Sequence, residues 1–332
     1  MFLSTFKTYR TDTLFRLPLW VLFLWTFSFF GERSFYYTPS SPFYDFVSGI
    51  ITQNLWGNKI VSFLLVLFSA YIFSYVTNHH QLLPSKSHLP AFFYALFVSY
   101  KPELLDFNKI VFLNLIYILV FDQLFRTYKK ESADNNIFNA GFLCGIAGLL
   151  FLPASLLLVL VFASLIILRT PSFREWLVAI IAFLIPFIYF ASYYFFTDQF
   201  QLVWHVFREE LNYKGFSFFF SGKIETILEL SFWALFVYSL LSYFFKKSPQ
   251  LIASQYTNSV IVLFTLFAAI IGYCFEENAC FAGFAIPASL LLSHVGVQIK
   301  KTGFFEFVLF CMILLIIAAH FEEQIFVFLN LK

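Results

Sequence analysis

Apolar runs long enough to cross a lipid bilayer recur along almost the whole chain. A helix needs about 20 apolar residues to span the hydrocarbon core of a membrane. The 332 residues are 60% hydrophobic and only 12% charged. A soluble domain cannot bury that much apolar surface, because it must present a polar exterior to water. The bilayer is therefore the expected solvent for most of this chain.

The apolar runs predict eleven membrane-spanning helices, and therefore an all-α fold, a polytopic membrane helix bundle. The predicted spans cover residues 14–30, 58–77, 89–100, 109–125, 137–152, 154–169, 175–197, 226–245, 257–275, 281–298 and 303–320. The third run, LPAFFYALFVSY, is too short to cross as a regular helix. It is tilted or broken, re-entrant, or part of a helix that begins near Ser85. We expect residues 1–332 to form a single integral membrane domain.

Lysine and arginine are concentrated in alternate loops, which predicts the orientation. One set of loops holds thirteen of the 21 basic residues: Lys7, Arg10, Arg16, Lys86, Arg126, Lys129, Lys130, Arg169, Arg174, Lys246, Lys247, Lys300 and Lys301. Because loops rich in Lys and Arg stay in the cytoplasm, the N-terminus is predicted to be cytoplasmic and the C-terminus to lie on the outer side of the membrane. This alternation requires that segment 89–100 crosses the bilayer.

Acidic residues and the two longest loops gather on the opposite, outer side. Twelve of the nineteen Asp and Glu residues fall there, together with loops 31–57 and 198–225. The cytoplasmic loops are short, and their Lys and Arg residues are typical of loops that only set the orientation in the membrane. Any chemistry is therefore expected at the outer face of the membrane.

Loop 31–57 predicts a short amphipathic helix that lies in the membrane interface. Ser41 suits the N-cap and Pro42 the first helical position. The expected apolar face consists of Phe43, Phe46, Val47, Ile50, Ile51 and Leu55, and the polar face of Asp45, Ser48, Thr52 and Gln53. Asp45 and Glu32 are the two carboxylates of this loop. Each of them, taken singly, also suits a loop that only has to stay solvated.

Loop 198–225 predicts a second interfacial helix, with Asp198 as its cap. Its expected apolar face is Phe200, Val203, Trp204, Phe207 and Leu211, with His205, Arg208 and Glu209 on the polar side. Lys214 and Lys223 follow in a segment that Gly215 and Gly222 allow to turn. Anionic lipid headgroups or phosphates would suit Arg208, Lys214 and Lys223.

The first outer loop, with GERSFYYTPSSPFYDFVSGIIT, resembles that of GT-C glycosyltransferases, which use polyprenyl-phosphate sugars. The resemblance covers about residues 10–200 and implies a GT-C-like module in residues 1–200. Residues 201–332 would add the second outer loop and the C-terminal spans. The resemblance also implies a catalytic carboxylate, Asp45 or Glu32. These two lie thirteen residues apart rather than as a tight acidic pair, and Asp45 is preferred because it falls on the polar helix face.

A second point of similarity is the stretch NNIFNAGFLCGIAGLLFLPASLLLVLVFASLIILR, residues 135–169. Many GT-C proteins have such a glycine-punctuated span and a returning span that ends in Arg. Gly141, Gly145 and Gly148 would allow close helix approach, as they would in any tight membrane hairpin. The stretch RTPSFREWLVAIIAFLIPFIY also looks like an uncharacterised bacterial inner-membrane family, which assigns no activity.

The resemblance implies transfer of a sugar from a polyprenyl-phosphate donor. One carboxylate would deprotonate the acceptor, and Arg208, Lys214, Lys223 or Lys101 would neutralise the departing lipid phosphate. No phosphate-cradling glycine loop and no metal-ligand spacing is recognised, so the cofactor, including a divalent metal, is left open. Nucleic acid is an unexpected partner, because basic residues form no stripe with interleaved aromatics.

Several other ionisable residues have both a functional and a structural interpretation. Glu103, Asp106 and Glu229 would form an acidic mouth with Asp45, although the first two also suit a plain loop that ends a short span. Asp122 is expected to pair with Arg126, and Glu175 with Arg174, near the cytoplasmic interface. Cys274 and Cys280 bracket a short outer loop and allow a disulfide, which spacing alone does not establish.

A non-enzymatic membrane protein is the competing hypothesis. A carrier for a lipid or small solute should show internal repeats with broken spans in matching positions. Pro153, Pro186 and Pro287 interrupt spans, but no repeat accompanies them, which counts against a carrier. A subunit of an envelope complex stays open as an alternative.

Overall fold

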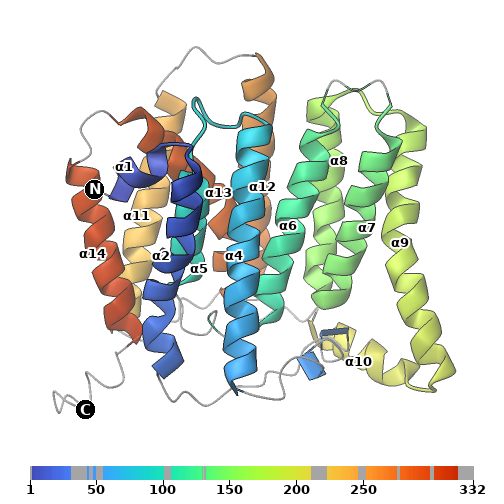
Figure 1. Cartoon of the computed structure of the whole chain (residues 1–332). Helices are drawn as coiled ribbons and strands as arrows, with labels where there is room; N and C mark the ends of the chain where they lie inside the picture. Colours follow the sequence, from blue (N-terminus) through green and yellow to red (C-terminus); the bar gives the residue numbers. More distant parts are fainter. Residues whose placement is uncertain are drawn as a thin grey trace.

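The structure is a computed structural model of the whole chain (Figure 1). It describes residues 2–30, 43–44, 48–49, 55–100, 105, 107–128, 130, 132–210, 223–245, 252–274, 277–299 and 303–320. Within these ranges all regular structure is helical, which confirms the all-α fold.

The helices form one bundle and run between its two ends (Figure 1). They are α1 (Phe2–Lys7), α2 (Thr11–Phe30), α4 (Leu55–His79), α5 (Leu89–Val98), α6 (Lys109–Phe125), α7 (Asp134–Leu150), the 3₁₀ helix η2 (Leu152–Leu156), α8 (Leu157–Leu168), α9 (Phe173–Phe196), α10 (Phe200–Glu210), α11 (Lys223–Phe245), α12 (Ile252–Cys274), α13 (Glu277–Gln298) and α14 (Gly303–His320).

We name the two ends of the bundle after the short helices that lie there. The α1 end, at the top of Figure 1, also carries residues 80–88 and the connections α6–α7 and α8–α9. The α10 end, at the bottom, carries Phe43–Tyr44, Ser48–Gly49 and the starts of α4 and α6. The described residues of the connections α4–α5, α6–α7 and α8–α9, which the sequence assigns to the cytoplasm, therefore lie at the α1 end. The described pieces of the two long outer loops lie at the α10 end.

Helix α5, the short third segment, lies entirely inside the bundle. All ten of its residues are buried, and it begins at Leu89, directly after His88. The alternative that the third apolar run belongs to a helix beginning near Ser85 is therefore wrong. Ten residues extend only about 15 Å, yet α4 ends at the α1 end and α6 begins at the α10 end (Figure 1). Other helices cover the short segment on all sides, so it does not need to meet the length that lipid demands.

Two helices meet the length and composition expected of a membrane span without further argument. These are Trp56–His79 and Phe173–Phe196, each with a mean hydropathy of 2.1. The apolar stretches of the other described helices are shorter, so the number of eleven spans stays a prediction. Helix α9 is the less covered of the two, and Ile181, Ile188 and Tyr189 are exposed on its outer side.

The glycines of α7 lie against α9, at the right of the bundle in Figure 1. A Cβ atom at Gly141 would meet the carbonyl oxygen of Ala179 at 2.5 Å, and one at Gly145 would meet that of Phe183 at 2.5 Å. At Gly148 it would meet the ring of Phe187 at 2.9 Å. The prediction that these glycines allow close helix approach is confirmed, and the partner is α9.

The two predicted interfacial helices are found in part. Phe43–Tyr44 and Ser48–Gly49 are helical, and α10 follows α9 as expected. Ser48, which was predicted on the polar face, is only 5% exposed, so that assignment is wrong. Asp198 is no regular cap either: its φ of 55° is left-handed, whereas N-caps are typically extended. It forms the turn between α9 and α10.

Asp122 holds α4 and α6 together at the α1 end. Its Oδ1 lies 2.9 Å from His80 Nε2, and its Oδ2 lies 2.8 Å from Arg126 Nε. The carboxylate side chain is 9% exposed. The predicted pair with Arg126 is confirmed, and His80, the residue directly after α4, is an additional partner.

The pairing predicted for Glu175 is wrong. Its Oε1 lies 2.8 Å from Arg169 Nη2, and its Oε2 accepts from the Ser172 backbone N–H at 3.0 Å. Arg174 instead binds Asp134 at 3.0 Å. Residues next to each other on a helix point in different directions, so Glu175 turns inward to Arg169 while Arg174 reaches outward to α7.

Candidate functional site

The backbone of Phe107 is held from two sides at the α10 end. Its N–H donates to Asn58 Oδ1 at 3.0 Å, and its carbonyl oxygen accepts from the Tyr44 hydroxyl at 2.8 Å. The Tyr44 and Phe107 rings also stack, with centroids 5.7 Å apart. All three side chains are buried. This arrangement ties the first outer loop to the segment that leads into α6.

Lys109, the first residue of α6, is a buried cation at the same end. It is 8% exposed, and its Nζ lies 4.7 Å from the centroid of the Phe151 ring. Asn108 starts the helix by accepting from the Ile110 N–H. A buried ammonium is costly unless negative groups or aromatic faces compensate it. The Phe151 ring provides one such face.

Lys109 was missed by the sequence analysis. At the start of an apolar run a lysine resembles a residue that extends into water, because its long side chain usually keeps its charge at the interface. The sequence signal that precedes it, an Asn cap before a helix, says nothing about burial. Its depth depends on Phe151, which comes from the end of α7 and is distant in sequence.

Aromatic contacts bring the two outer loops together beside α9. The Phe43 ring lies 6.2 Å from that of Phe190, and Phe190 lies 6.1 Å from Phe207 of α10. Figure 1 accordingly shows the short helical pieces Phe43–Tyr44 and Ser48–Gly49 beside α10. Phe43 and Phe207 therefore make these contacts from the helix faces that were predicted to be apolar. Trp204, which was predicted on the same face of α10 as Phe207, is 65% exposed.

Most of the predicted site residues fall outside the described part of the chain. Arg208 is placed: it lies in the last turn of α10 and is exposed. Lys223 and Glu229 lie in the first turns of α11, but their side chains are not described. The residues outside the described ranges are Asp45, Glu32, Lys214, Lys101, Glu103 and Asp106. The roles predicted for all of them stay predictions.

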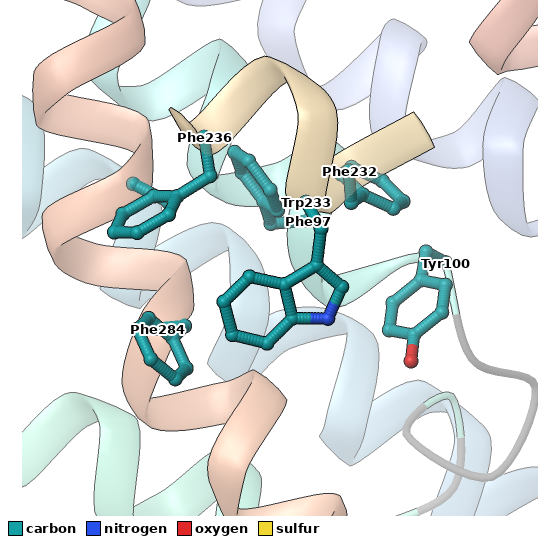
Figure 2. A pocket seen from close by; sticks show the side chains of 7 residues that line it. Phe97, Tyr100, Phe232, Trp233, Phe236 and Phe284 are labelled. Carbon is teal, nitrogen blue, oxygen red and sulfur yellow. The ribbon is translucent and has the colours of Figure 1, made fainter. Parts of the chain in front are cut away.

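An aromatic hollow opens between α5, α11 and α13 (Figure 2). It is lined by Phe97, Tyr100, Phe232, Trp233, Phe236, Phe284 and Ala288. The rings are in close contact, with Phe97 and Phe232 centroids 4.7 Å apart and Trp233 and Phe284 centroids 5.1 Å apart. The lining is almost wholly apolar, so the hollow suits a piece of apolar chain.

Within the described ranges, no three His, Cys, Asp or Glu side chains gather closely enough to hold a metal ion. Cys144 and Cys311, the two cysteines whose side chains the structure describes, are free thiols. The predicted disulfide between Cys274 and Cys280 stays untested, because their side chains are not described.

The arrangement of the helices is similar to that of a solved structure. The chain matches the crystal structure of ArnT from Cupriavidus metallidurans bound to undecaprenyl phosphate with a TM-score of 0.55 and 14% identity. The match covers 82% of this chain and 52% of that chain. The GT-C-like resemblance expected from the sequence is therefore confirmed at the level of the fold.

A second match is an oligosaccharyltransferase of Archaeoglobus fulgidus, tethered with an acceptor peptide containing the NVT sequon. Its TM-score is 0.46 at 11% identity, over 92% of this chain and 51% of that chain. The chain thus spans about half the length of both solved structures.

The chain belongs to DUF6427, a family of unknown function. The model of this family matches residues 44–328, which include most of the bundle. No curated protein matches the chain. Membership in this family carries no activity with it, so the function has to be argued from the site.

Proposed function

We propose that this protein is a membrane-embedded glycosyltransferase that takes a sugar from a polyprenyl-phosphate donor at the periplasmic face of the inner membrane. The observation that carries the proposal is the buried Lys109, two residues beyond the Phe107 backbone to which Tyr44 is bonded. Asp45 follows Tyr44 in the chain. A cation for the lipid phosphate and a carboxylate for the acceptor thus belong to two segments that are tied together.

The reaction requires two separate contributions from the protein. Asp45, or Glu32, accepts the proton of the acceptor nucleophile as its new bond to the anomeric carbon forms. The bond between that carbon and the phosphate oxygen breaks, and the polyprenyl phosphate leaves with the electron pair. Lys109 stabilises the negative charge that grows on this phosphate, in a site where low water content strengthens the attraction.

The remaining cations of the outer face would complete the phosphate site. Arg208 on α10 is exposed at the same end of the bundle. Lys214, Lys223 and Lys101 are its proposed companions, and Glu103, Asp106 and Glu229 the proposed acidic mouth toward the acceptor. The lipid tail would enter sideways between helices, which accounts for a site at the membrane boundary rather than in a water-filled cleft.

The likeness to ArnT supports the fold on which this proposal builds. ArnT was crystallised with undecaprenyl phosphate, a polyprenyl phosphate. The present chain corresponds to about half of that protein, so its acceptor and its sugar are separate questions. The positive loops of the α1 end support a cytoplasmic N-terminus and a catalytic face on the α10 side.

The test is to introduce Asp45→Asn and Glu32→Gln into a strain from which the gene is deleted, and to profile the glycans of envelope proteins and lipids. A matched control is Asp134→Asn, which changes a carboxylate paired with Arg174 at the α1 end. We expect Asp45→Asn to abolish the glycan product and Asp134→Asn to leave it unchanged. Full restoration by both loop variants would contradict the proposal.

A further inference from the structure

Tyr44 and Asn58 grip both backbone groups of one residue, Phe107. The Asn58 amide oxygen accepts the Phe107 N–H, and the Tyr44 hydroxyl donates to the Phe107 carbonyl oxygen. The three residues come from the first outer loop, the start of α4 and the segment before α6. Phe107 therefore joins the first outer loop and the start of α4 to a segment that lies far along the chain. We call Tyr44, Asn58 and Phe107 together the Phe107 clamp.

The Phe107 clamp is protected from water. Asn58 and Phe107 are each 2% exposed, and Tyr44 is 7% exposed. A buried hydrogen bond cannot be exchanged for one to water, so its loss leaves a donor or acceptor unsatisfied. Stacking of the Tyr44 ring on that of Phe107, at an interplanar angle of 17°, orients the hydroxyl toward the carbonyl. The stacking and the hydrogen bond together fix the position of the Tyr44 ring and the direction of its hydroxyl group.

The residues next to the clamp are those with chemistry in the proposed function. Asp45 follows Tyr44, and consecutive Cα atoms are about 3.8 Å apart. Lys109 follows Phe107 by two residues and is itself buried against Phe151. A second contact, between Phe43 and Phe190, ties the residue on the other side of Tyr44 to α9.

We propose that Tyr44 and Asn58 are positioning residues that hold the first outer loop in a fixed place beside the start of α6, where Lys109 lies. This inference rests on the proposed function, because it takes Asp45 and Lys109 as its acting groups. Neither Tyr44 nor Asn58 touches the reacting atoms. A displacement of about 1 Å between reacting groups lowers a rate roughly a hundredfold, so a loosened clamp should reduce turnover while the bundle stays folded.

The experiment compares three variants of the clamp with one control in the full-length protein. Tyr44→Phe removes only the hydroxyl, Asn58→Leu removes the acceptor, and Asn58→Asp keeps an acceptor oxygen in the same place. Tyr117→Phe is the control, since it removes another buried hydroxyl, in α6, far from the clamp. Hydrogen exchange of the peptide that contains the Phe107 amide reports the bond to Asn58 directly, and reports the Tyr44 bond through the loosening of the segment that it holds. The glycan product in the deletion strain reports turnover.

We expect Asn58→Leu and Tyr44→Phe to speed exchange at Phe107 roughly tenfold and to reduce the glycan product, with Asn58→Asp restoring both and Tyr117→Phe changing neither. Unchanged exchange in Tyr44→Phe and Asn58→Leu would overturn the clamp itself. Faster exchange with a normal product level would overturn the positioning role. If Asp45→Asn alone leaves the product intact, the proposed function fails and the positioning role fails with it, while exchange still decides whether the clamp exists.

Discussion

Gly145 of α7 packs directly on the backbone of Phe183 in α9, and this contact predicts the effect of one added methyl group. A Cβ atom there would also meet Pro186 Cγ at 3.0 Å. Gly145→Ala should therefore destabilise the protein by about 1–3 kcal/mol, the usual cost of overpacking. This exceeds the roughly 1 kcal/mol that alanine contributes to a helix relative to glycine. Thermal unfolding in detergent measures the difference.

Gly303 is the matched control for this substitution. It starts α14, and no atom lies within 4 Å of the position that its Cβ would take. Gly303→Ala should leave the melting temperature unchanged or slightly raised. An equal loss of stability in both variants would show that the close approach of α7 and α9 is not what Gly145 provides.

The ion pairs of the α1 end should differ strongly in their contribution to stability. Asp122 is buried between two partners, whereas Arg174 is 79% exposed in its pair with Asp134. Asp122→Ala should cost about 3 kcal/mol or more, since it leaves Arg126 without its counter-charge and His80 Nε2 without its hydrogen-bond partner. Arg174→Ala should cost less than about 1 kcal/mol. Denaturant titration of both variants would contradict this ranking if the two losses were equal.

His88 predicts a loss of stability in mild acid. Burial lowers its pKa below the ordinary value of 6.5, against an opposing hydrogen bond to the Arg10 backbone. The unfolded chain therefore binds a proton that the folded protein resists, and the free energy of unfolding falls as the pH drops below 6.5, down to the folded-state pKa. Above 6.5 this contribution is fully present.

The measurement is the melting temperature as a function of pH in the wild type and in His88→Gln. The histidine ring accepts or donates at Ser74 Oγ, 2.9 Å away, and stacks on Tyr9. His88→Gln is expected to lower stability at neutral pH and to flatten the acid side of the curve. Two parallel curves would mean that His88 does not cause the pH dependence.

Features with a local cause were predictable from the sequence. The pair of Asp122 and Arg126 follows from residues four apart on one helix, which face the same way. The approach of α7 at Gly141, Gly145 and Gly148 follows from the lack of side chains at helical spacing. The concentration of Lys and Arg in alternate loops likewise predicted which of the described connections lie at the same end of the bundle.

Features that depend on distant partners were not predictable. Glu175 pairs with Arg169 because the turn between α8 and α9 brings that arginine back, which adjacency in sequence does not reveal. Ser48 is buried although its polarity suggested the wet face of a helix. Lys109 looked like an ordinary helix start because nothing nearby in sequence announces the Phe151 ring. Burial of a polar residue is decided by what packs on it.

Lys109 should dominate binding of the donor phosphate. A charge-assisted hydrogen bond contributes about 1.5–3 kcal/mol, so Lys109→Met should weaken the affinity for undecaprenyl phosphate by roughly 10-fold to 150-fold. Native mass spectrometry of the purified protein measures this, with phosphatidylglycerol as a second anionic lipid. Lys130→Met, an exposed lysine at the α1 end, is the control and should bind normally. Thermal unfolding of Lys109→Met in detergent separates a loss of binding from a loss of the fold. Equal binding by both variants, or an equal loss for phosphatidylglycerol, would contradict a specific phosphate site at Lys109.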